Sequence, residues 1–474
     1  MRFALFQRRG SSRRGQAALA LPLALAAALL LLVVLSSLSV GVDGAAASVT
    51  PRTRSTTSTP SAATAASSAP PSARGALTSA TIPVTGAPVA TGMKPWITAA
   101  EKVMRTYHLP GASLAVAFEG RVVLEEGLGY ADVAAKAPVE PDSIFRLASV
   151  SKSITATLVG MLINEHKLAL STRPFATVLS ALRGPHGTKP VDPRLQDITV
   201  GDLLIHAGGW DDTEAGYTAT QDPGPEEAAL GLHTDPTCEQ AIEYMLGVRL
   251  NFTPGTKYAY SNFGYCVLAD TIAHVTHMTY ANAAKSMLFA PLHMEHTALS
   301  PANPATLLPG EAHFYGQGDQ ASGPDSPSEF SLYTSEGCGN WTSTAPDLER
   351  FLIATAATTP GSSPFPNWAQ VSIAGQSIPG VSPYPSQQGP DPSGQGTYWN
   401  FDGALPGTAT EVGVFGPITY VMLTNSQEAD NTTNFAPLQQ LAEKETTAPA
   451  SSWPNGELLS PPPVVNTPAH QVER

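Results

Sequence analysis

Residues 145–162 read FRLASVSKSITATLVGML, an apolar stretch with helical spacing that carries one lysine, Lys152, near its start. Ser149 stands three residues earlier, where such a helix would begin. Side chains at positions i and i+3 of a helix lie on one face, one turn apart, so the lysine can reach the serine hydroxyl. Apolar neighbours favour the neutral amine, which can accept the hydroxyl proton and make the serine a nucleophile.

The same stretch also has a structural interpretation, in which a serine caps the helix and Lys152 points into solvent. Two features favour the chemical interpretation. Residues 149–152 form the only S-x-x-K in the chain, and they follow a predicted hairpin at the start of a long apolar helix. A serine at a helix N-terminus also lies beside the positive end of the helix dipole, which suits a developing oxyanion.

A second motif lies in residues 251–270, NFTPGTKYAYSNFGYCVLAD. A Pro-Gly turn precedes Tyr260 and Asn262, which stand just before a predicted helix. Residues two apart in an extended segment point the same way, so the phenol could relay a proton while the amide orients substrate and lysine. The alternative is that Tyr260 is a packing residue and Asn262 a helix cap.

Strand-like patterns lie towards both ends of residues 94–446, with mainly helical patterns between them. Strand-like runs flank a turn at Glu119-Gly120, and further strands are predicted at 396–401, 410–415 and 418–425. The remaining patterns are helical, at 95–108, 149–167, 238–250, 263–276, 280–288 and 347–357. The sequence therefore predicts an α/β domain, with an antiparallel sheet built from both termini, flanking helices and an inserted, mainly helical lobe.

The ends of the chain differ in composition from this domain. Residues 1–47 combine five arginines, an apolar stretch and an A-x-A-like site at Ala45–Ala47, which is typical of a signal peptide. The apolar stretch is also long enough for a signal anchor of about 20 residues. Either way the rest of the chain is expected to be exported. Residues 48–93 predict a disordered linker rich in Ser, Thr, Pro and Ala, and residues 447–474 a disordered, Pro-rich tail.

Net charge argues against one class of partner, and the cysteines limit the metal sites and disulfides that the chain can form. The formal net charge is −13, and about −17 without residues 1–47, so nucleic acid is a poor candidate partner. The sequence has no H-E-x-x-H and no paired C-x-x-C, so it gives no support for a zinc site. Three cysteines permit at most one internal disulfide. Because Cys266 has the pattern of a helix-core residue, the expected pair is Cys238–Cys338.

Five motifs in order resemble those of the serine beta-lactamase-like hydrolases. They are FRLASVSK, LLIHAGGW at 203–210, PGTKYAYSNFGY, GCGNWTSTAPDLERF at 337–351 and DGALPG at 402–407. That superfamily includes class C beta-lactamases, D-alanyl-D-alanine carboxypeptidases, D-aminopeptidases and related family VIII esterases. The resemblance spans residues 95–427. It implies an α/β sandwich with a helical lobe, an acyl-enzyme on serine, and neither metal nor cofactor.

The resemblance also assigns roles to particular residues. Ser149 matches the nucleophile and Lys152 its activating lysine. Tyr260 matches the tyrosine that acts as general base and acid, with Asn262 as its polar companion. His206, in LLIHAGGW, is expected to be a packing residue beneath the site.

The last of the five motifs, together with the Phe401 that precedes it, departs from the family pattern. Where the family usually has Lys or His, then a small residue, then Gly, this chain has Phe401, Asp402 and Gly403. The backbone N–H of Ala404 matches the group that completes the oxyanion hole with that of Ser149. Phe401 can neither donate a hydrogen bond nor carry a positive charge, and a site for a substrate carboxylate usually uses such a group. If Asp402 faced the substrate, it would discourage anionic substrates further.

These observations lead to two hypotheses of function. The first is an exported serine hydrolase that acts on small-molecule or peptide esters or amides, as an esterase or a D-amino-acid peptidase. Its N-terminal segment would release it or tether it to the membrane or cell wall. The second is a weakly active or inactive module that keeps the fold and binds cell-wall peptides or another partner.

Overall fold

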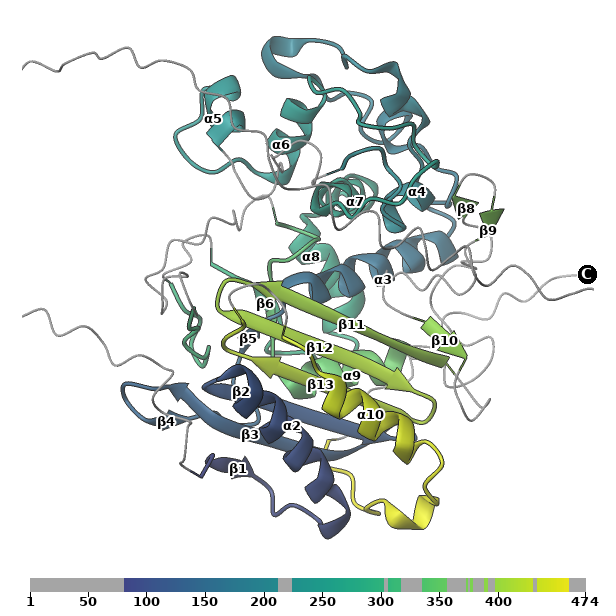
Figure 1. Ribbon diagram of the computed structural model, residues 1–474. Helices are drawn as coiled ribbons and strands as arrows, with labels where there is room; N and C mark the ends of the chain where they lie inside the picture. The colour runs from purple at the N-terminus through teal and green to yellow at the C-terminus, as the bar shows by residue number, and fades with distance from the viewer. Residues whose placement is uncertain are drawn as a thin grey trace, which may run out of the picture. The chain divides into compact units, whose positions relative to one another are not determined.

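The computed structural model describes residues 81–211, 224–301, 306–316, 335–355, 372–373, 376–377, 388–390, 397–428 and 433–459 (Figure 1). The predicted signal segment, residues 1–47, lies outside these ranges. Within them, no helix is both long enough and apolar enough to cross a membrane.

The central element is an antiparallel sheet with the strand order β1-β3-β2-β13-β12-β11-β10, and β4 pairs with β3. Strands β2 and β13 are hydrogen-bonded neighbours, so strands from both ends of the domain meet at its centre. This confirms the predicted architecture. The strands are β1 (Val84–Gly86), β2 (Gly111–Phe118), β3 (Arg121–Asp132), β4 (Ala137–Pro138), β10 (Gln388–Pro390), β11 (Thr397–Leu405), β12 (Thr408–Phe415) and β13 (Ile418–Thr424).

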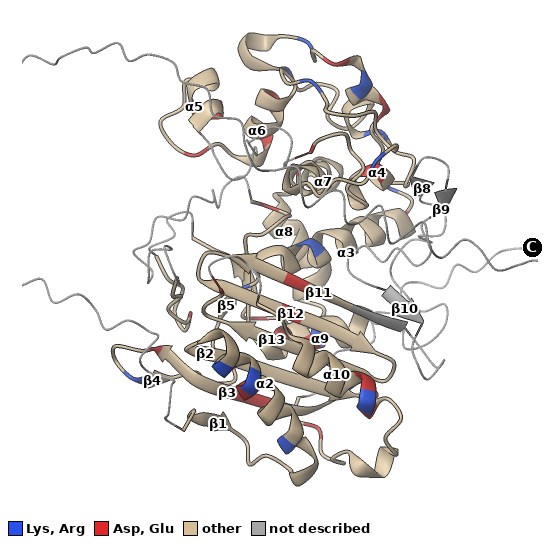
Figure 2. Cartoon of the chain, viewed as in Figure 1, with Lys and Arg blue, Asp and Glu red and all other residues tan. Residues whose placement is uncertain are grey.

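Both faces of the sheet are covered, which explains why its central strands are buried along their whole length rather than at alternate residues. Helices α2 (Lys94–Tyr107) and α10 (Ala436–Glu445) lie on one face, and α9 (Ala345–Thr355) lies on the other (Figure 1). Every residue of β2, β12 and β13 is buried. Charged side chains are few on the sheet and on the central helices of the lobe (Figure 2).

The inserted lobe is mainly helical, as predicted. Its helices are α3 (Ser151–Asn164), α4 (Val200–Leu204), α5 (Gly224–Leu230), α6 (Cys238–Met245), α7 (Asn262–Thr276) and α8 (Tyr280–Ala284). A small sheet of β5 (Phe145–Arg146), β7 (Trp341–Ser343) and β6 (Ala298–Leu299) lies beside them, and β8 (Ser372–Ile373) pairs with β9 (Gln376–Ser377). The apolar side chains of α3 and α7 form one core cluster with those of α6 and with the inner face of β11 and β12.

The predicted linker boundary at residue 93 is wrong. β1 pairs with β3 through Val84–Gly86, and Ile82 and Met93 are buried in the core on the α2 side. A few large apolar side chains in a Ser- and Pro-rich context are therefore enough to extend the folded part to about residue 82.

The predicted tail boundary at residue 447 is also wrong. Trp453 is buried and stacks on Phe118, with ring centroids 4.5 Å apart and an interplanar angle of 8°. The Leu458 N–H donates to the Val122 carbonyl over 3.0 Å. The folded domain therefore continues beyond α10 to about residue 459.

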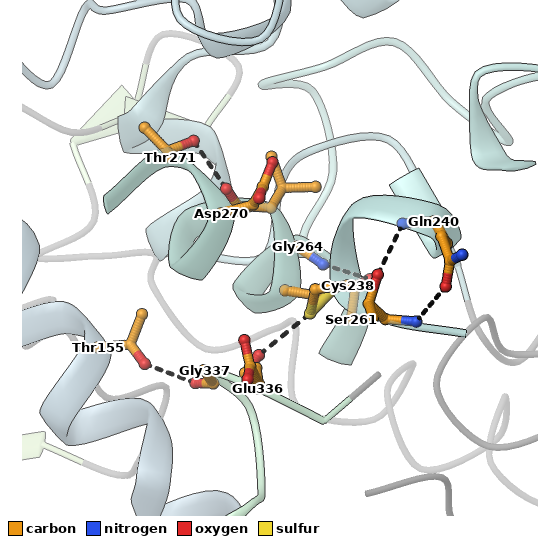
Figure 3. The surroundings of a disulfide bond; sticks show 12 residues. Thr155, Cys238, Gln240, Ser261, Gly264, Asp270, Thr271, Glu336 and Gly337 are labelled. Carbon is orange, nitrogen blue, oxygen red and sulfur yellow. Dashed lines mark hydrogen bonds between the residues drawn. A yellow bond between two sulfur atoms is a disulfide. The ribbon is translucent and has the colours of Figure 1, made fainter. Parts of the chain in front are cut away.

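The predicted disulfide is wrong as well. Cys238 bonds to Cys266, with the two Cα atoms 5.6 Å apart, and Cys338 is buried outside the bond (Figure 3). Cys238, the first residue of α6, lies against α7. Cys266 of α7, expected to be only a core residue, is therefore close enough to form the disulfide. The bond joins these two helices of the lobe.

Two of the buried carboxyl groups lie on opposite faces of the sheet and have strongly raised pKa values. Glu349 of α9 accepts a hydrogen bond from Thr419, and burial raises the pKa of its carboxyl to about 8. Glu411 of β12 accepts hydrogen bonds from Tyr420 and, over 2.8 Å, from Gln439. Burial raises the pKa of Glu411 to about 8 as well. Both groups therefore keep their protons at neutral pH in the folded chain.

These two groups predict that the domain loses stability as the pH rises. An unfolded glutamate releases its proton near pH 4.5, whereas the folded ones hold theirs to about pH 8. Their contribution to stability is complete below about pH 4.5 and is lost towards pH 8. Each group then lowers the free energy of unfolding by up to ~1.4 kcal/mol per pH unit in that window.

Urea unfolding between pH 5 and 8 measures this slope. Glu349→Gln and Glu411→Gln should each flatten it, because a neutral amide does not titrate. A free energy of unfolding that rises over this range, or a slope that neither substitution changes, would contradict the assignment.

Candidate active site

Ser149 lies in a 3-10 turn, Ala148–Val150, that leads directly into α3. The turn follows β5, and the Leu147 N–H donates to the Trp341 carbonyl over 2.8 Å. Ala148 has a left-handed backbone, with φ of 48°, which is uncommon for a residue other than glycine. The chain therefore turns sharply just before the serine and presents it at the start of the helix, as the motif predicts.

Lys152 is fully buried, so the interpretation of this residue as a solvated lysine is wrong. Its Nζ lies 3.1 Å from Ser149 Oγ, 2.7 Å from Asn262 Oδ1 and 2.8 Å from the Cys338 carbonyl oxygen. A buried amine without partners would be very unfavourable, and these three acceptors offset that cost. The lysine is fixed against the serine by contacts with three separate segments of the chain.

Tyr260 reaches the same serine from the segment that precedes α7. Its Oη lies 2.8 Å from Ser149 Oγ. Ser261 is the N-cap of α7 and accepts from the Gly264 N–H over 3.3 Å, so the cap is Ser261 rather than Asn262. The structure thus brings together four of the residues that the sequence singles out, two from the α3 motif and two from the α7 motif.

Two proton arrangements satisfy these contacts. A protonated Lys152 donates one hydrogen to each of its three acceptors, and the Ser149 hydroxyl then donates to the Tyr260 oxygen. A neutral Lys152 donates only to Asn262 and Cys338, accepts the Ser149 hydroxyl proton, and leaves Tyr260 to donate to the serine. In both arrangements a proton acceptor for the serine hydroxyl is already in position.

The Cys338 carbonyl is a contact that the motif analysis missed, because a main-chain group leaves no residue signature. Its position depends on the preceding Gly337, whose carbonyl accepts from Thr155 Oγ1 over 2.7 Å (Figure 3). A Cβ on Gly337 would lie 2.6 Å from the Tyr265 carbonyl oxygen and 2.7 Å from the Ala269 side chain. The segment therefore passes so close to α7 that only glycine fits at this position.

Gly403 of β11 lies against the backbone of the nucleophile turn. A Cβ at this position would be 2.5 Å from the Leu147 carbonyl oxygen and 2.9 Å from the Ser149 nitrogen. Thr410, opposite Gly403 on β12, donates from Oγ1 to the same Leu147 carbonyl over 2.9 Å. The glycine thus permits β11 to approach the serine, and Ala404 is the next residue along that strand.

Phe401 and Asp402, the two residues before Gly403 on β11, do not line the site with charge. Phe401 is only 4% exposed and belongs to the core cluster that includes α3. Asp402 is paired in register with Glu411, whose carboxyl oxygen accepts from Gln439 on α10. Because side chains alternate along a strand, Asp402 points to the α10 face, away from Ser149.

His206 packs directly against the site, in agreement with the expected packing role. Its ring stacks on that of Tyr260, with centroids 4.4 Å apart and an interplanar angle of 27°. Its Nδ1 accepts from the Ser261 N–H over 3.1 Å. Burial, together with the nearby Lys152 charge, lowers the pKa of His206 to about 3. The imidazole is therefore neutral and supports the tyrosine without adding a second charge.

Metal chemistry has no evident protein ligands here. Among the described residues, no three His, Cys, Asp or Glu side chains are grouped so that they could hold an ion. The reactive side chains of the site are one serine, one buried lysine and one tyrosine.

Sequence comparison matches this arrangement to a known family. The beta-lactamase family model aligns with residues 96–443. Among curated proteins, Protein flp of Staphylococcus aureus strain N315 is 28% identical over 240 residues, which cover 49% of this chain. The chain spans about 45% of the length of that relative.

Solved structures share the fold. The D-amino acid amidase of Ochrobactrum anthropi SV3, solved with L-phenylalanine amide, superposes with a TM-score of 0.54 at 21% identity and covers 75% of this chain and 99% of its own. The D-alanine carboxypeptidase AmpC of Burkholderia cenocepacia has a TM-score of 0.53 at 20% identity, with 75% and 99% covered.

The family model covers most of the described domain, and its range includes the residues assigned from the motifs. The predicted family is therefore confirmed. The chain belongs to the beta-lactamase family, within the serine beta-lactamase-like hydrolases.

Proposed function

We propose that this chain is an exported serine hydrolase that cleaves esters or amides through an acyl-enzyme on Ser149. The observation that carries the proposal is the position of the Ser149 hydroxyl, which is 3.1 Å from Lys152 Nζ and 2.8 Å from Tyr260 Oη. Serine is a weak nucleophile until a base takes its proton, and both candidate bases are within hydrogen-bonding distance.

In the first half of the reaction, Ser149 Oγ attacks the substrate carbonyl carbon. Its proton passes to Lys152 or Tyr260, and Tyr260 returns a proton to the leaving alcohol or amine as the carbonyl–leaving-group bond breaks. Water then attacks the acyl carbon and gives up a proton to the same pair. The bond between the acyl carbon and Ser149 Oγ breaks, the pair returns the proton to Ser149 Oγ, and the acid is released. Asn262 holds the lysine side chain through both halves.

The negative charge that develops on the carbonyl oxygen needs hydrogen-bond donors at a fixed position. The backbone N–H groups of Ser149 and Ala404 are the proposed pair. The close approach of Gly403 to the Ser149 nitrogen supports this assignment, because it brings the β11 backbone next to the nucleophile turn.

The proposed substrates are neutral on the side that faces β11. Phe401 occupies the place where the family usually has a cation, and it is buried in the core. Two solved proteins with this fold are named as a D-amino acid amidase and a D-alanine carboxypeptidase, which supports amide hydrolysis as one chemistry of the scaffold. Neutral esters and amides are therefore preferred over substrates that need a bound carboxylate.

The N-terminal segment supports export. Residues 1–47 have the charge and hydropathy pattern of a signal peptide or signal anchor. The Ser-, Thr- and Pro-rich residues that follow would then act as a spacer between the membrane or cell wall and the domain.

The second candidate function is a binding module that keeps the fold without turnover. The observation that favours it is Phe401, which stands where the family usually has a Lys or His. This candidate predicts saturable binding of wall peptides that survives loss of Ser149, and no covalent intermediate with any ester.

Substitutions in the site separate the two candidates. Ser149→Ala should abolish hydrolysis of a chromogenic ester, and Lys152→Ala and Tyr260→Phe should each lower kcat/KM by about 10²- to 10⁴-fold, the usual contribution of acid–base catalysis. Circular dichroism and the unfolding temperature of each variant provide the control for folding. Hydrolysis by Ser149→Ala at the rate of the parent would rule out the mechanism.

The neutral state of His206 predicts the shape of the pH–rate profile. Because the pKa of His206 is held near 3, its protonation should contribute no step in kcat/KM between pH 5 and 8. His206→Phe keeps a ring against Tyr260 but loses the acceptor for the Ser261 N–H, so kcat should fall while the apparent pKa values of the profile stay in place. A titration step that disappears in His206→Phe would assign the imidazole a proton-transfer role instead.

A further inference from the structure

One aromatic side chain next to the site is exposed. Large apolar or aromatic side chains with high exposure are few among the described residues: Val84, Val191, Tyr258, Met278 and Leu458. Tyr258 is the aromatic member of this set and is 46% exposed. It lies two residues before Tyr260, whose hydroxyl contacts the proposed nucleophile.

Tyr258 and Tyr260 both contact the His206 ring, so the exposed tyrosine lies close to the one at the site. Residues 257–260 carry no helix or turn assignment and lead into α7. In an extended segment, side chains two apart point the same way, with Cα atoms roughly 7 Å apart. That spacing is about the width of one substrate group, so the Tyr258 ring is placed for a group attached next to the scissile carbonyl.

The Tyr258 ring is held from behind by His206. The two ring centroids are 5.8 Å apart at an interplanar angle of 80°, an edge-to-face contact. The same imidazole stacks on Tyr260. The backbone carbonyl of His206 also accepts from the Ala259 N–H over 2.9 Å. A single neutral, buried side chain therefore fixes both tyrosines relative to each other, which reduces the entropic cost of binding a ligand.

The charge next to Tyr258 is already neutralised. Lys257 Nζ lies 2.6 Å from Asp211 Oδ2, and the same amine lies over the Phe252 ring at 5.6 Å from its centroid. The Asp211 side chain is buried. An ion pair of this kind neither attracts an anion nor attracts a cation strongly, so the exposed face beside it favours an uncharged ligand.

We propose that Tyr258 is a specificity-determining residue, whose exposed ring stacks on an aromatic group of a neutral ester or amide next to the scissile carbonyl. This inference rests on the proposed function, since it takes Ser149 as the reacting residue. It deepens that function by naming the substrate class: neutral aromatic acyl compounds, such as phenylacetyl esters and amides, over small aliphatic ones.

The test compares two methyl esters that share a leaving group and differ in the acyl group. Acid release from methyl phenylacetate and methyl butyrate is followed by titration at constant pH. Tyr258→Ala should lower kcat/KM about 10-fold for the phenylacetate and at most about twofold for the butyrate, which is the range expected for loss of one aromatic stacking contact. Tyr258→Phe should retain the preference. Met278→Ala, which removes an exposed side chain just beyond the far end of α7, is the matched control.

A binding measurement keeps this inference separate from the catalytic mechanism. In Ser149→Ala, which cannot turn over, saturation-transfer NMR with phenylacetamide reports stacking alone, and adding Tyr258→Ala should remove the signal. If the parent hydrolyses neither ester but this signal depends on Tyr258, the proposed function fails and the stacking role stands. Equal losses of kcat/KM for both esters, or an NMR signal that does not depend on Tyr258, would overturn the stacking role.

Discussion

The buried amine of Lys152 holds together the three segments that form the site. A fully buried Lys152 is tolerated only because a hydroxyl, a side-chain amide and a main-chain carbonyl all lie within hydrogen-bonding distance of its Nζ. Those acceptors belong to the α3 turn, to the start of α7 and to the segment before β7. The three segments must therefore pack together for the domain to fold, and the same packing places the amine against Ser149. Stability and the proposed chemistry share one set of contacts.

Glycines and neutral supports complete the arrangement. Gly337 and Gly403 occupy positions where a Cβ would overlap a neighbouring backbone, so each permits a close approach that positions a main-chain group at the site. His206 packs below Tyr260 without charge, because burial and the neighbouring lysine disfavour its protonation. The Cys238–Cys266 disulfide joins α6 to α7 one turn beyond Asn262.

The sequence predicted the architecture and most of the site because the relevant signals are local. Two of these signals can be recognised without knowledge of the fold. They are the i, i+3 spacing of Ser149 and Lys152 and the turn followed by a helix around Tyr260. The Cys338 carbonyl could not be identified in this way, because its role depends on the path of the backbone rather than on its side chain. The side of the sheet to which Asp402 points required the register of β11 and β12.

The errors have a common physical origin in tertiary packing. The disulfide was mispredicted because the contact between α6 and α7 brings Cys238 beside a residue that reads as helix core. The linker and tail were predicted too long because composition averages over Ile82 and Trp453, single large side chains that the core buries. Propensity and composition describe a segment, whereas burial is decided by what lies next to it.

The central claim is that the contact with Lys152 makes Ser149 a nucleophile. Intact mass spectrometry after incubation with a fluorophosphonate probe, followed by peptide mapping, tests it most directly because the probe needs no knowledge of the natural substrate. We expect a single adduct on Ser149 that forms at least about 100-fold more slowly in Lys152→Ala, because the substitution removes a proton acceptor. A folded protein that forms no adduct, an adduct on another residue, or an equal rate in Lys152→Ala would contradict it.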